Sequence, residues 1–138
     1  AMLHDIGILI SYFDHHKHSS YMIANSKING LTHKEQIMAS YIAALHRKNE
    51  FKIDLKLYQG LITKQDLELI DKLSILLRIS ESLDRYLTGN IEMVSCIIGA
   101  STVTITVDAK DDPLLEKSAA LDCCSSFQKI YNKKLIIK

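Results

Sequence analysis

The sequence has few of the residues that break or cross-link a chain. It contains one proline, five glycines, three cysteines and no tryptophan among 138 residues. Three cysteines are an odd number and none has the paired spacing of a zinc ribbon, so we expect reduced thiols in a cytoplasmic protein. No apolar run approaches the roughly 20 residues that cross a bilayer, and the first residues lack a signal-peptide pattern, so we expect no membrane partner.

An excess of charge of one sign is also lacking. Seventeen Lys and Arg residues balance sixteen Asp and Glu residues, which leaves a net charge of +1. The molecule as a whole therefore attracts a polyanion only weakly, and any anion site must come from local clustering. Because no aromatic stacking platform or known motif accompanies the basic residues, nucleic acid is not an expected partner.

What the chain does have is apolar residues, 47% of the total, enough for one packed core with a small appendage. Ala1 leads into the first apolar residues without a capping residue, as in a helix cut midway, so we infer a piece of a longer protein. That first helix is expected to end between Gly7 and Ile10. A short helix then opens at residues 15–19 and ends in the turn-forming stretch 25–30.

Two stronger helix signals follow. Thr32 and Glu35 have the spacing of a capping box, and the apolar residues of the helix that it begins lie on one stripe: Ile37, Met38, Tyr41, Ile42 and Leu45. Residues 51–57 alternate in polarity and are either a short exposed strand or an ordered linker. Thr63 caps a long helix to about residue 88, on which one line of residues predicts a buried face that includes Asp84: Ile70, Leu73, Leu77, Ser80, Asp84 and Leu87.

Beyond Gly89 the pattern changes to that of strands. Apolar residues from 91 to 98, a turn at Gly99 and strict alternation over 103–107 predict a hairpin. Pro113 precedes a helix over 114–127, and residues 135–137 form a closing strand. We therefore predict an α+β fold, mainly α, with a helical domain at 1–88 and a small β-β-α-β unit at 89–138.

His4 and Asp5 carry the first chemical signal. Their side chains point about 100° apart on a helix, so they meet at one ion only at a helix end or beside a crossing helix, for which Gly7 leaves room. Imidazole and carboxylate together suit Zn, Fe, Mn or Ni. The structural alternative is an interhelical hydrogen bond with a charge at a helix end.

Asp84 is the second signal. A carboxylate on a buried helix face needs a partner, because an unpaired buried charge costs several kcal/mol. A salt bridge to Arg78 would satisfy it, whereas Arg85 points elsewhere and pairs locally with Glu81. A metal ion or His4 is the functional alternative.

Two basic segments make up the third signal. Residues 15–18 precede a helix start, where backbone amides favour an anion such as phosphate. His46, Arg47 and Lys48 end the following helix. Solvated polar surface is the alternative for the first segment, and cations that complement a helix dipole are the alternative for the second.

The order of these motifs resembles the C-terminal half of the Ppx/GppA family. The resemblance rests on the strings LHDIG, HHKHSSYMI, LHRK and LRISESLDR, which begin at residues 3, 15, 45 and 77. It implies an HD-type helical fold in a cytoplasmic hydrolase of polyphosphate or guanosine pentaphosphate. It also implies that the parent active site lies in N-terminal actin-like domains, whose phosphate loop and catalytic carboxylates are absent from these residues.

The resemblance also implies roles for particular residues. His4, Asp5 and Asp84 match three metal ligands of the wider HD phosphohydrolase superfamily, and a fourth ligand, an earlier histidine, would precede residue 1. His18 and His46 look like the additional histidines of binuclear or phosphate-contacting HD sites. In the Ppx/GppA family the module resembles a region for polyphosphate binding and dimerisation more than a second active site.

Together these signals predict a module of a phosphoanhydride hydrolase that lacks the parent activity, binds polyphosphate or guanosine polyphosphate, and forms a homodimer. Linear polyphosphate carries about one charge per unit, so binding through Lys and Arg would weaken steeply with salt. The predicted phosphate-binding residues are His16, Lys17, His18, His46, Arg47 and Lys48. The alternative is a metal-dependent HD-type phosphohydrolase, in which His4, Asp5 and Asp84 hold Mn, Zn, Fe or Ni.

Overall fold

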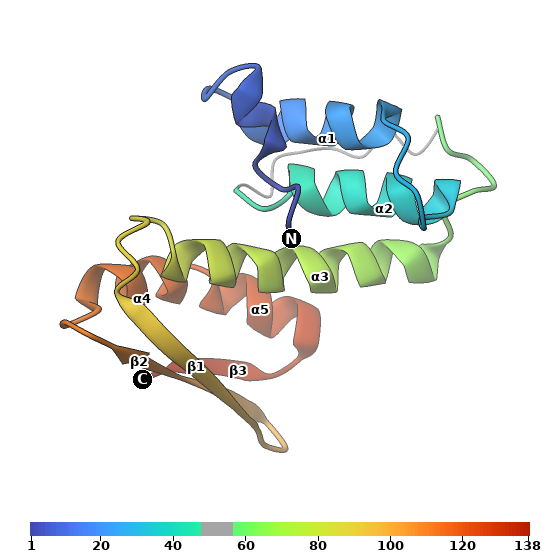
Figure 1. Cartoon of the computed structure of the whole chain (residues 1–138). Coiled ribbons are helices and arrows are strands. Elements are labelled where there is room, and N and C mark those ends of the chain that lie inside the picture. The colour runs from blue at the N-terminus through green and yellow to red at the C-terminus, as the bar shows by residue number, and fades with distance from the viewer. Residues whose placement is uncertain (48–56) are drawn as a thin grey trace. The chain divides into compact units, whose positions relative to one another are not determined.

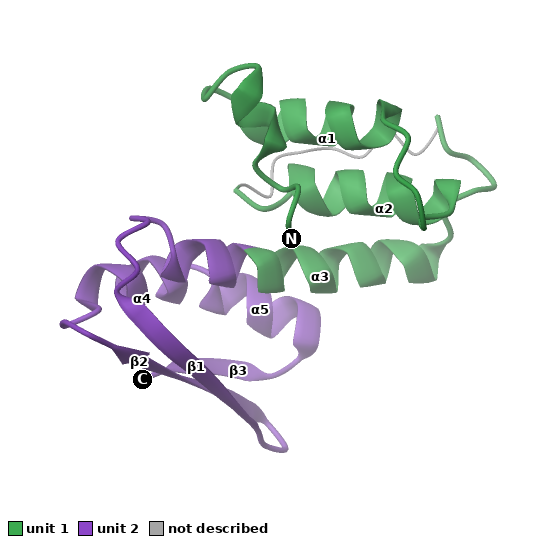
Figure 2. Ribbon diagram, in the orientation of Figure 1, with its two compact units in different colours: residues 1–77 green, residues 78–138 purple. Residues whose placement is uncertain are grey.

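The structure is a computed structural model that describes residues 1–47 and 57–138 (Figure 1). Helices predominate and a small three-stranded sheet accompanies them, so the predicted α+β class is confirmed. The chain divides into two compact units, residues 1–77 and 78–138 (Figure 2). The boundary at residues 88 and 89 stays a prediction. None of the helices in the described ranges is long and apolar enough to span a bilayer.

Unit 1 begins with turns rather than with the expected α-helix. Residues 2–5 form a turn, and Ile6–Leu9 form the 3₁₀ helix η1. Backbone amides of this segment donate to carbonyls three residues earlier, as from Ile6 to Leu3 and from Ile8 to Asp5, and the segment lies so close to the next helix at Gly7 that an added Cβ would meet the His15 carbonyl oxygen. The Gly7 amide donates a hydrogen bond to Ser19 Oγ, so this segment is held against the next helix. That helix, α1, spans His15–Asn25, as the sequence predicted.

Helix α2, His33–Ala44, runs beside α1 (Figure 1). The predicted capping box is present: Thr32 Oγ1 accepts from the Glu35 amide, and the Glu35 carboxylate accepts from the Thr32 amide. The predicted apolar stripe of α2 forms the core of unit 1 with Ile70. The buried members of this core are Ile37, Met38, Tyr41, Leu45 and Ile70.

Two polar residues of α2, Gln36 and Ser40, are also buried. The Gln36 side-chain amide donates to the backbone carbonyls of Ile23, Ala24 and Ser26, at distances of 2.8, 3.1 and 2.6 Å. These carbonyls lie at the end of α1, where a helix has no further backbone donors of its own. Gln36 is therefore buried because it caps α1 from α2.

Helix α3 spans Lys64–Leu83 and starts at the predicted residue. Thr63 Oγ1 accepts from the Asp66 amide, and the Asp66 carboxylate accepts from the Thr63 amide and forms an ion pair with Lys34 of α2. The helix ends about five residues earlier than predicted. Asp84 is the first residue after the helix, and its amide donates to the Ser80 carbonyl at 3.1 Å.

The predicted buried line of α3 is wrong beyond Ile70. Leu73 and Ser80 are exposed, as are Asp84 and Leu87, which follow the helix, whereas the residues that are buried on α3 include Ser74, Ile75, Ile79 and Leu83. Residue 87 has a left-handed backbone with φ of 51°, which no helix continues. Because Asp84 is exposed, burial gives no reason for it to require a partner.

Unit 2 contains the sheet. Strands β1, Ile91–Ile98, and β2, Thr102–Ala109, form the predicted antiparallel hairpin, and β3, Lys134–Ile137, lies parallel to β2 (Figure 1). The chain between β2 and β3 contains two helices, α4 (Leu114–Leu121) and α5 (Cys124–Tyr131). The single helix predicted over 114–127 is therefore wrong. Ala120, Cys123 and Phe127 are all buried, so the apolar pattern continues across the break and conceals it.

Candidate metal centre

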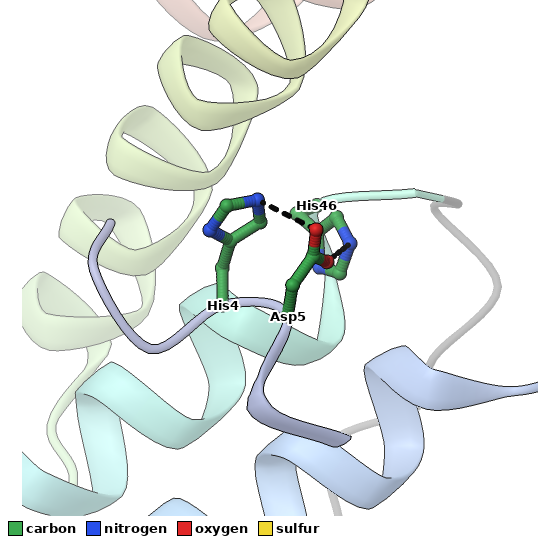
Figure 3. Close-up of side chains that lie close together, drawn as sticks. All are labelled: His4, Asp5 and His46. Carbon is green, nitrogen blue, oxygen red and sulfur yellow. Dashed lines mark ion pairs between the residues drawn. The ribbon is translucent and has the colours of Figure 1, made fainter. Parts of the chain in front are cut away.

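Four side chains of unit 1 converge on one point. His4 and Asp5 come from the turn before η1, His15 is the first residue of α1, and His46 follows the end of α2. Asp5 Oδ1 lies 3.1 Å from His15 Nε2 and 3.3 Å from His46 Nε2, and Asp5 Oδ2 lies 3.4 Å from His4 Nε2. Figure 3 shows His4 and His46 on either side of the Asp5 carboxylate.

Hydrogen bonds to the backbone fix the tautomer of each histidine. The Nδ1 atom of each ring lies close to the carbonyl oxygen three residues earlier: 2.6 Å for His4 to Ala1, 2.9 Å for His15 to Tyr12, and 2.5 Å for His46 to Ala43. A carbonyl only accepts hydrogen bonds, so Nδ1 must carry the proton in each ring. In the neutral imidazole, Nε2 then carries a lone pair.

The three Nε2 atoms therefore direct electron density at a carboxylate. Within the described residues, Asp5 Oδ1 is buried and accepts no hydrogen bond, although two ring nitrogens lie within 3.3 Å. His15 Nε2 and His46 Nε2 are themselves only 3.2 Å apart. Lone pairs this close repel one another unless a positive charge lies between them. A metal ion held between these atoms would supply that charge.

The donor set fits a transition-metal ion. Asp5 Oδ1, His15 Nε2 and His46 Nε2 form a triangle with edges of 3.1, 3.3 and 3.2 Å. Donors around a tetrahedral zinc ion at about 2.0–2.1 Å lie roughly 3.3 Å apart. His4, Asp5 and His46 also lie within mutual reach of one ion, since their ligand atoms are all within 4.8 Å of one another. Imidazole with one carboxylate suits Zn, Fe or Ni.

Buried packing supports the ligands. His46 and His15 are 1% and 3% exposed, and the His46 ring lies at 5.0 Å from the His4 ring and 5.2 Å from the His15 ring, measured between centroids. The carbonyls that accept from Nδ1 orient each ring, as outer partners do in metal sites. The prediction that Gly7 makes room for a crossing helix is also confirmed, because its missing side chain lets the turn with His4 and Asp5 approach α1.

Among the metal ligands predicted from sequence, His4 and Asp5 take part in this cluster. Asp84 is an exposed residue of unit 2, and its role as a ligand stays a prediction. His15 belongs to the cluster and was missed as a candidate ligand, because it stood in a run of polar residues interpreted as an anion site. Gly7 offered a signal for His15, because a glycine two residues after Asp5 lets this turn lie directly against the start of the next helix, where His15 is the first residue.

The predicted phosphate-binding residues differ in how they are placed. Lys17 is exposed and its ammonium pairs with the Asp14 carboxylate at 2.8 Å, at the start of α1. His16 is buried, and burial holds the pKa of its imidazole below the ordinary value, which disfavours the charged form that would bind an anion. His18 is half-buried, Arg47 is exposed, and Lys48 lies outside the described residues.

These features define a helical module with a cluster of three histidines around one carboxylate. The sequence model of Ppx/GppA phosphatase, domain III, matches residues 1–122. The chain therefore belongs to the Ppx/GppA phosphatase family, as its domain III, which confirms the resemblance noted in the sequence.

A curated relative supports this membership. The chain is 39% identical over 49 residues to a guanosine-5'-triphosphate,3'-diphosphate pyrophosphatase of Pseudoalteromonas translucida (strain TAC 125). The match covers 36% of this chain and 10% of the relative. The chain thus matches about a tenth of the relative's length.

Proposed function

We propose that this domain III module binds the phosphate chain of polyphosphate or guanosine polyphosphate with the help of a divalent metal ion. His4, Asp5, His15 and His46 would hold the ion. The observation that carries the proposal is the buried Asp5 Oδ1, which accepts no hydrogen bond from the described residues while imidazole nitrogens that carry lone pairs surround it. A bound divalent ion would supply the positive charge that attracts phosphate oxygens.

Protein cations would add to that charge. Arg47 is exposed and its guanidinium lies 3.5 Å from His15 Nδ1, so it would add a positive charge beside the cluster at this end of α2. Lys17 already pairs with Asp14, so its net contribution to an anion site is smaller. Binding should weaken between about 50 and 200 mM salt, and Arg47→Ala should weaken it more than Lys17→Ala does.

The first experiment measures metal. The 138-residue chain, stripped with a chelator and titrated with Zn²⁺ or Ni²⁺ in a calorimeter, should bind one equivalent. Asp5→Asn and His46→Gln should each lower the affinity at least about tenfold, because each replaces a carboxylate or imidazole ligand with a neutral amide, which binds a transition metal weakly. His33→Gln is the matched control, since His33 is exposed on α2 and lies outside the cluster. Equal metal affinity in Asp5→Asn and in the unmodified chain would contradict the metal site.

The second experiment measures phosphate. Tripolyphosphate should bind the metal-loaded chain more tightly than the metal-free chain, and the difference should vanish in Asp5→Asn. Binding that ignores both metal and salt would exclude the proposal. If a protonated histidine rather than a metal neutralises Asp5, no stoichiometric metal will be found and the metal-dependent part of the affinity will be absent.

The same donor set supports a second candidate, a metal-dependent phosphohydrolase. Three protein donors with an open position are the arrangement with which catalytic zinc sites activate water. Release of orthophosphate from tripolyphosphate, measured with added Mn²⁺ or Ni²⁺, distinguishes the two candidates. Turnover lost in Asp5→Asn but kept in His33→Gln supports hydrolysis, and tight binding without turnover supports the binding module.

Dimerisation is proposed on a separate observation in unit 2. Strand β1 is at an edge of the described sheet, and its residues from 92 to 98 are all exposed, including Met93, Val94, Ile97 and Ile98. An exposed apolar edge strand readily pairs with another chain. Sedimentation across concentration should show a dimer that Ile97→Lys weakens. Leu114→Lys is the control, because Leu114 is exposed to a similar extent on α4.

A further inference from the structure

The open edge of strand β1 carries a regular row of backbone groups. The Gly99 amide donates to the Thr102 carbonyl at 2.8 Å, so this pair closes the hairpin between β1 and β2. Antiparallel pairs alternate between hydrogen-bonded and non-hydrogen-bonded, so counting back from Gly99 makes Ile98, Cys96 and Val94 non-hydrogen-bonded towards β2. The backbone groups of these three residues therefore point to the open edge.

The pairing of β2 with β3 supports this direction. Ile105, the partner of Cys96 on β2, accepts from the Lys138 amide at 2.9 Å. The Val107 amide donates to the Lys138 carbonyl, also at 2.9 Å. Ile105 and Val107 thus direct these groups to the side of β3, away from β1. Their partners on β1, Cys96 and Val94, direct theirs to the opposite side, which is the edge of the described sheet.

Apolar side chains of β1 are left uncovered on one face of the sheet. Val94 lies opposite Val107 and Ile98 lies opposite Val103, and cross-strand partners share a face. Val103 and Val107 are each 8% exposed, whereas Val94 and Ile98 are 48% and 73% exposed. Residues 93–98 include no charged residue and no proline, which commonly keep an edge strand from pairing. This edge therefore favours a further strand.

We propose that β1 of a second copy occupies this edge, antiparallel to the first and related to it by a two-fold axis at Cys96. This pairing rests on the proposed dimer and gives it a register and an axis. An axis at Cys96 places this residue opposite its own copy and Val94 opposite Ile98, so all three outward-facing residues pair. The two uncovered apolar side chains then contact each other across the axis.

Neighbouring registers are less favourable. Side chains that lie opposite one another must share a face, so the register can shift only by two residues at a time. A shift in one direction would place Ile98 opposite residue 92, beside the irregularity between Ile91 and Met93. A shift in the other direction would place Val94 opposite Ala100, in the hairpin turn. Only the axis at Cys96 keeps every outward-facing residue within regular strand.

Opposite charges meet at both ends of the paired strands in this register. Lys133 Nζ donates to the carbonyls of Gly99 and Ala100 at 2.6 and 2.7 Å, so its ammonium lies at the hairpin turn. Residue 100 lies opposite residue 92 of the second copy, and Glu92 is exposed. The carboxylate of each copy would therefore approach the ammonium of the other. This charge complementarity favours a second copy of the chain as the occupant.

Disulfide formation measures the register. Two Cα atoms in a hydrogen-bonded antiparallel pair are about 5.5 Å apart, which a disulfide spans, so two Cys96 thiols should cross-link. Diamide is the oxidant and takes up the two protons and two electrons that the thiols lose. The 138-residue chain should give a covalent dimer at concentrations where sedimentation shows a dimer. Cys96→Ser is the control, because any product of Cys123 or Cys124 remains in it.

A displaced pair of cysteines tests the register more strictly. In the Cys96→Ser background, copies with Val94→Cys should cross-link to copies with Ile98→Cys when the two are mixed and oxidised. Neither should cross-link alone, because two residues of the same number would then lie roughly 14 Å apart, beyond the reach of a disulfide.

The charged ends are tested by sedimentation. Glu92→Gln removes an exposed ion pair at each end, so it should weaken the dimer by about 2- to 30-fold, and by less at about 1 M salt. Glu68→Gln is the matched control, because Glu68 is an exposed glutamate on α3, and it should leave the dimer unchanged.

The outcomes separate the register from the dimer on which it rests. A chain that sediments as a monomer at every concentration would overturn both. A dimer that Ile97→Lys weakens but that forms no Cys96 disulfide would overturn only the register. Val94→Cys copies that cross-link alone as well as in the mixture would overturn it too, as would assemblies larger than a dimer, since a two-fold pairing closes. Circular dichroism of each variant checks that the fold is kept.

Discussion

Replacement of Gly7 by alanine is the most direct test of how the candidate metal centre is built. The added Cβ would lie 2.2 Å from the His15 carbonyl oxygen, 2.4 Å from the Ser19 amide nitrogen and 2.8 Å from His18 Cβ. Ordinary contacts begin near 3.4 Å, so the turn must move away from α1 by about 1 Å against backbone atoms. Overpacking of this kind costs about 1–3 kcal/mol.

The same movement would break a buried hydrogen bond. The Gly7 amide donates to Ser19 Oγ at 2.9 Å, and Ser19 is fully buried, so the separated groups would lose about 1–3 kcal/mol more. We therefore expect Gly7→Ala to lower the free energy of unfolding by about 2–6 kcal/mol. Because His4 and Asp5 lie in the displaced turn and His15 does not, metal affinity should fall as well.

The assay is urea unfolding followed by circular dichroism, combined with metal titration of the same samples. Gly30→Ala is the control, since an added Cβ there meets nothing within 4 Å and only the strain of its φ of +90° remains, about 1–2 kcal/mol. Ser19→Ala separates the hydrogen bond from the steric clash. A Gly7→Ala protein as stable as Gly30→Ala, with unchanged metal affinity, would refute the packing argument.

Three further predictions concern stability. Gln36→Leu should lower the free energy of unfolding by about 2–4 kcal/mol in urea, because three carbonyls at the end of α1 lose their donor, whereas exposed Gln65→Leu should have little effect. Ile70→Ala should cost about 2–5 kcal/mol, since Ile70 is fully buried, and half-exposed Leu69→Ala much less, as measured in the same assay. The Lys34 ion pair and the Thr63 hydrogen bonds lower the pKa of Asp66 from 3.8 to about 2. The ionised Asp66 carboxylate therefore stabilises the fold above about pH 4, and this stabilisation is lost as the pH falls towards 2. In Asp66→Asn, the Tm should depend less on pH over this range.

Each of these has a result that contradicts it. Gln36→Leu with unchanged stability would mean that water replaces the side-chain donor at the end of α1. Similar losses for Ile70→Ala and Leu69→Ala would place the core elsewhere. A Tm that falls between pH 4 and 2 as steeply in Asp66→Asn as in the unmodified chain would assign the acid sensitivity to other carboxylates.

Local signals predicted most of the helices and strands. The Thr32 capping box, the start of α3 after Thr63 and the β1–β2 hairpin are determined within a few residues of sequence, and the structure confirms each. The end of α3 was predicted too late because the apolar period continued past the residue where the backbone turns. The break between α4 and α5 was missed for the same reason, because the buried residues Ala120, Cys123 and Phe127 are spaced by three and four residues across it, as they would be in one continuous helix.

The candidate site was predicted in part. His4, Asp5 and His46 were chosen from sequence because their residue types and motif order suit metal or phosphate. His15 was assigned to an anion site, yet it lies against Asp5 and His46. Asp84 was chosen as a metal ligand because its position on the helix predicted burial, but the residue is exposed. Lys17 was chosen as a phosphate-binding cation, but its ammonium already forms an ion pair with Asp14.

The sequence by itself determined the family, the α+β class, the starts of α1, α2 and α3 and the presence of several histidines near the N-terminus, because each depends on residue identity and short spacing. Only the tertiary structure decided which histidines meet. His15 and His46 are 31 residues apart and become neighbours through the packing of α1 on α2, and His4 and Asp5 join them because Gly7 lets their turn approach α1. The same packing brings Arg47 over the Tyr12 ring, a contact between distant chain segments that no local pattern encodes.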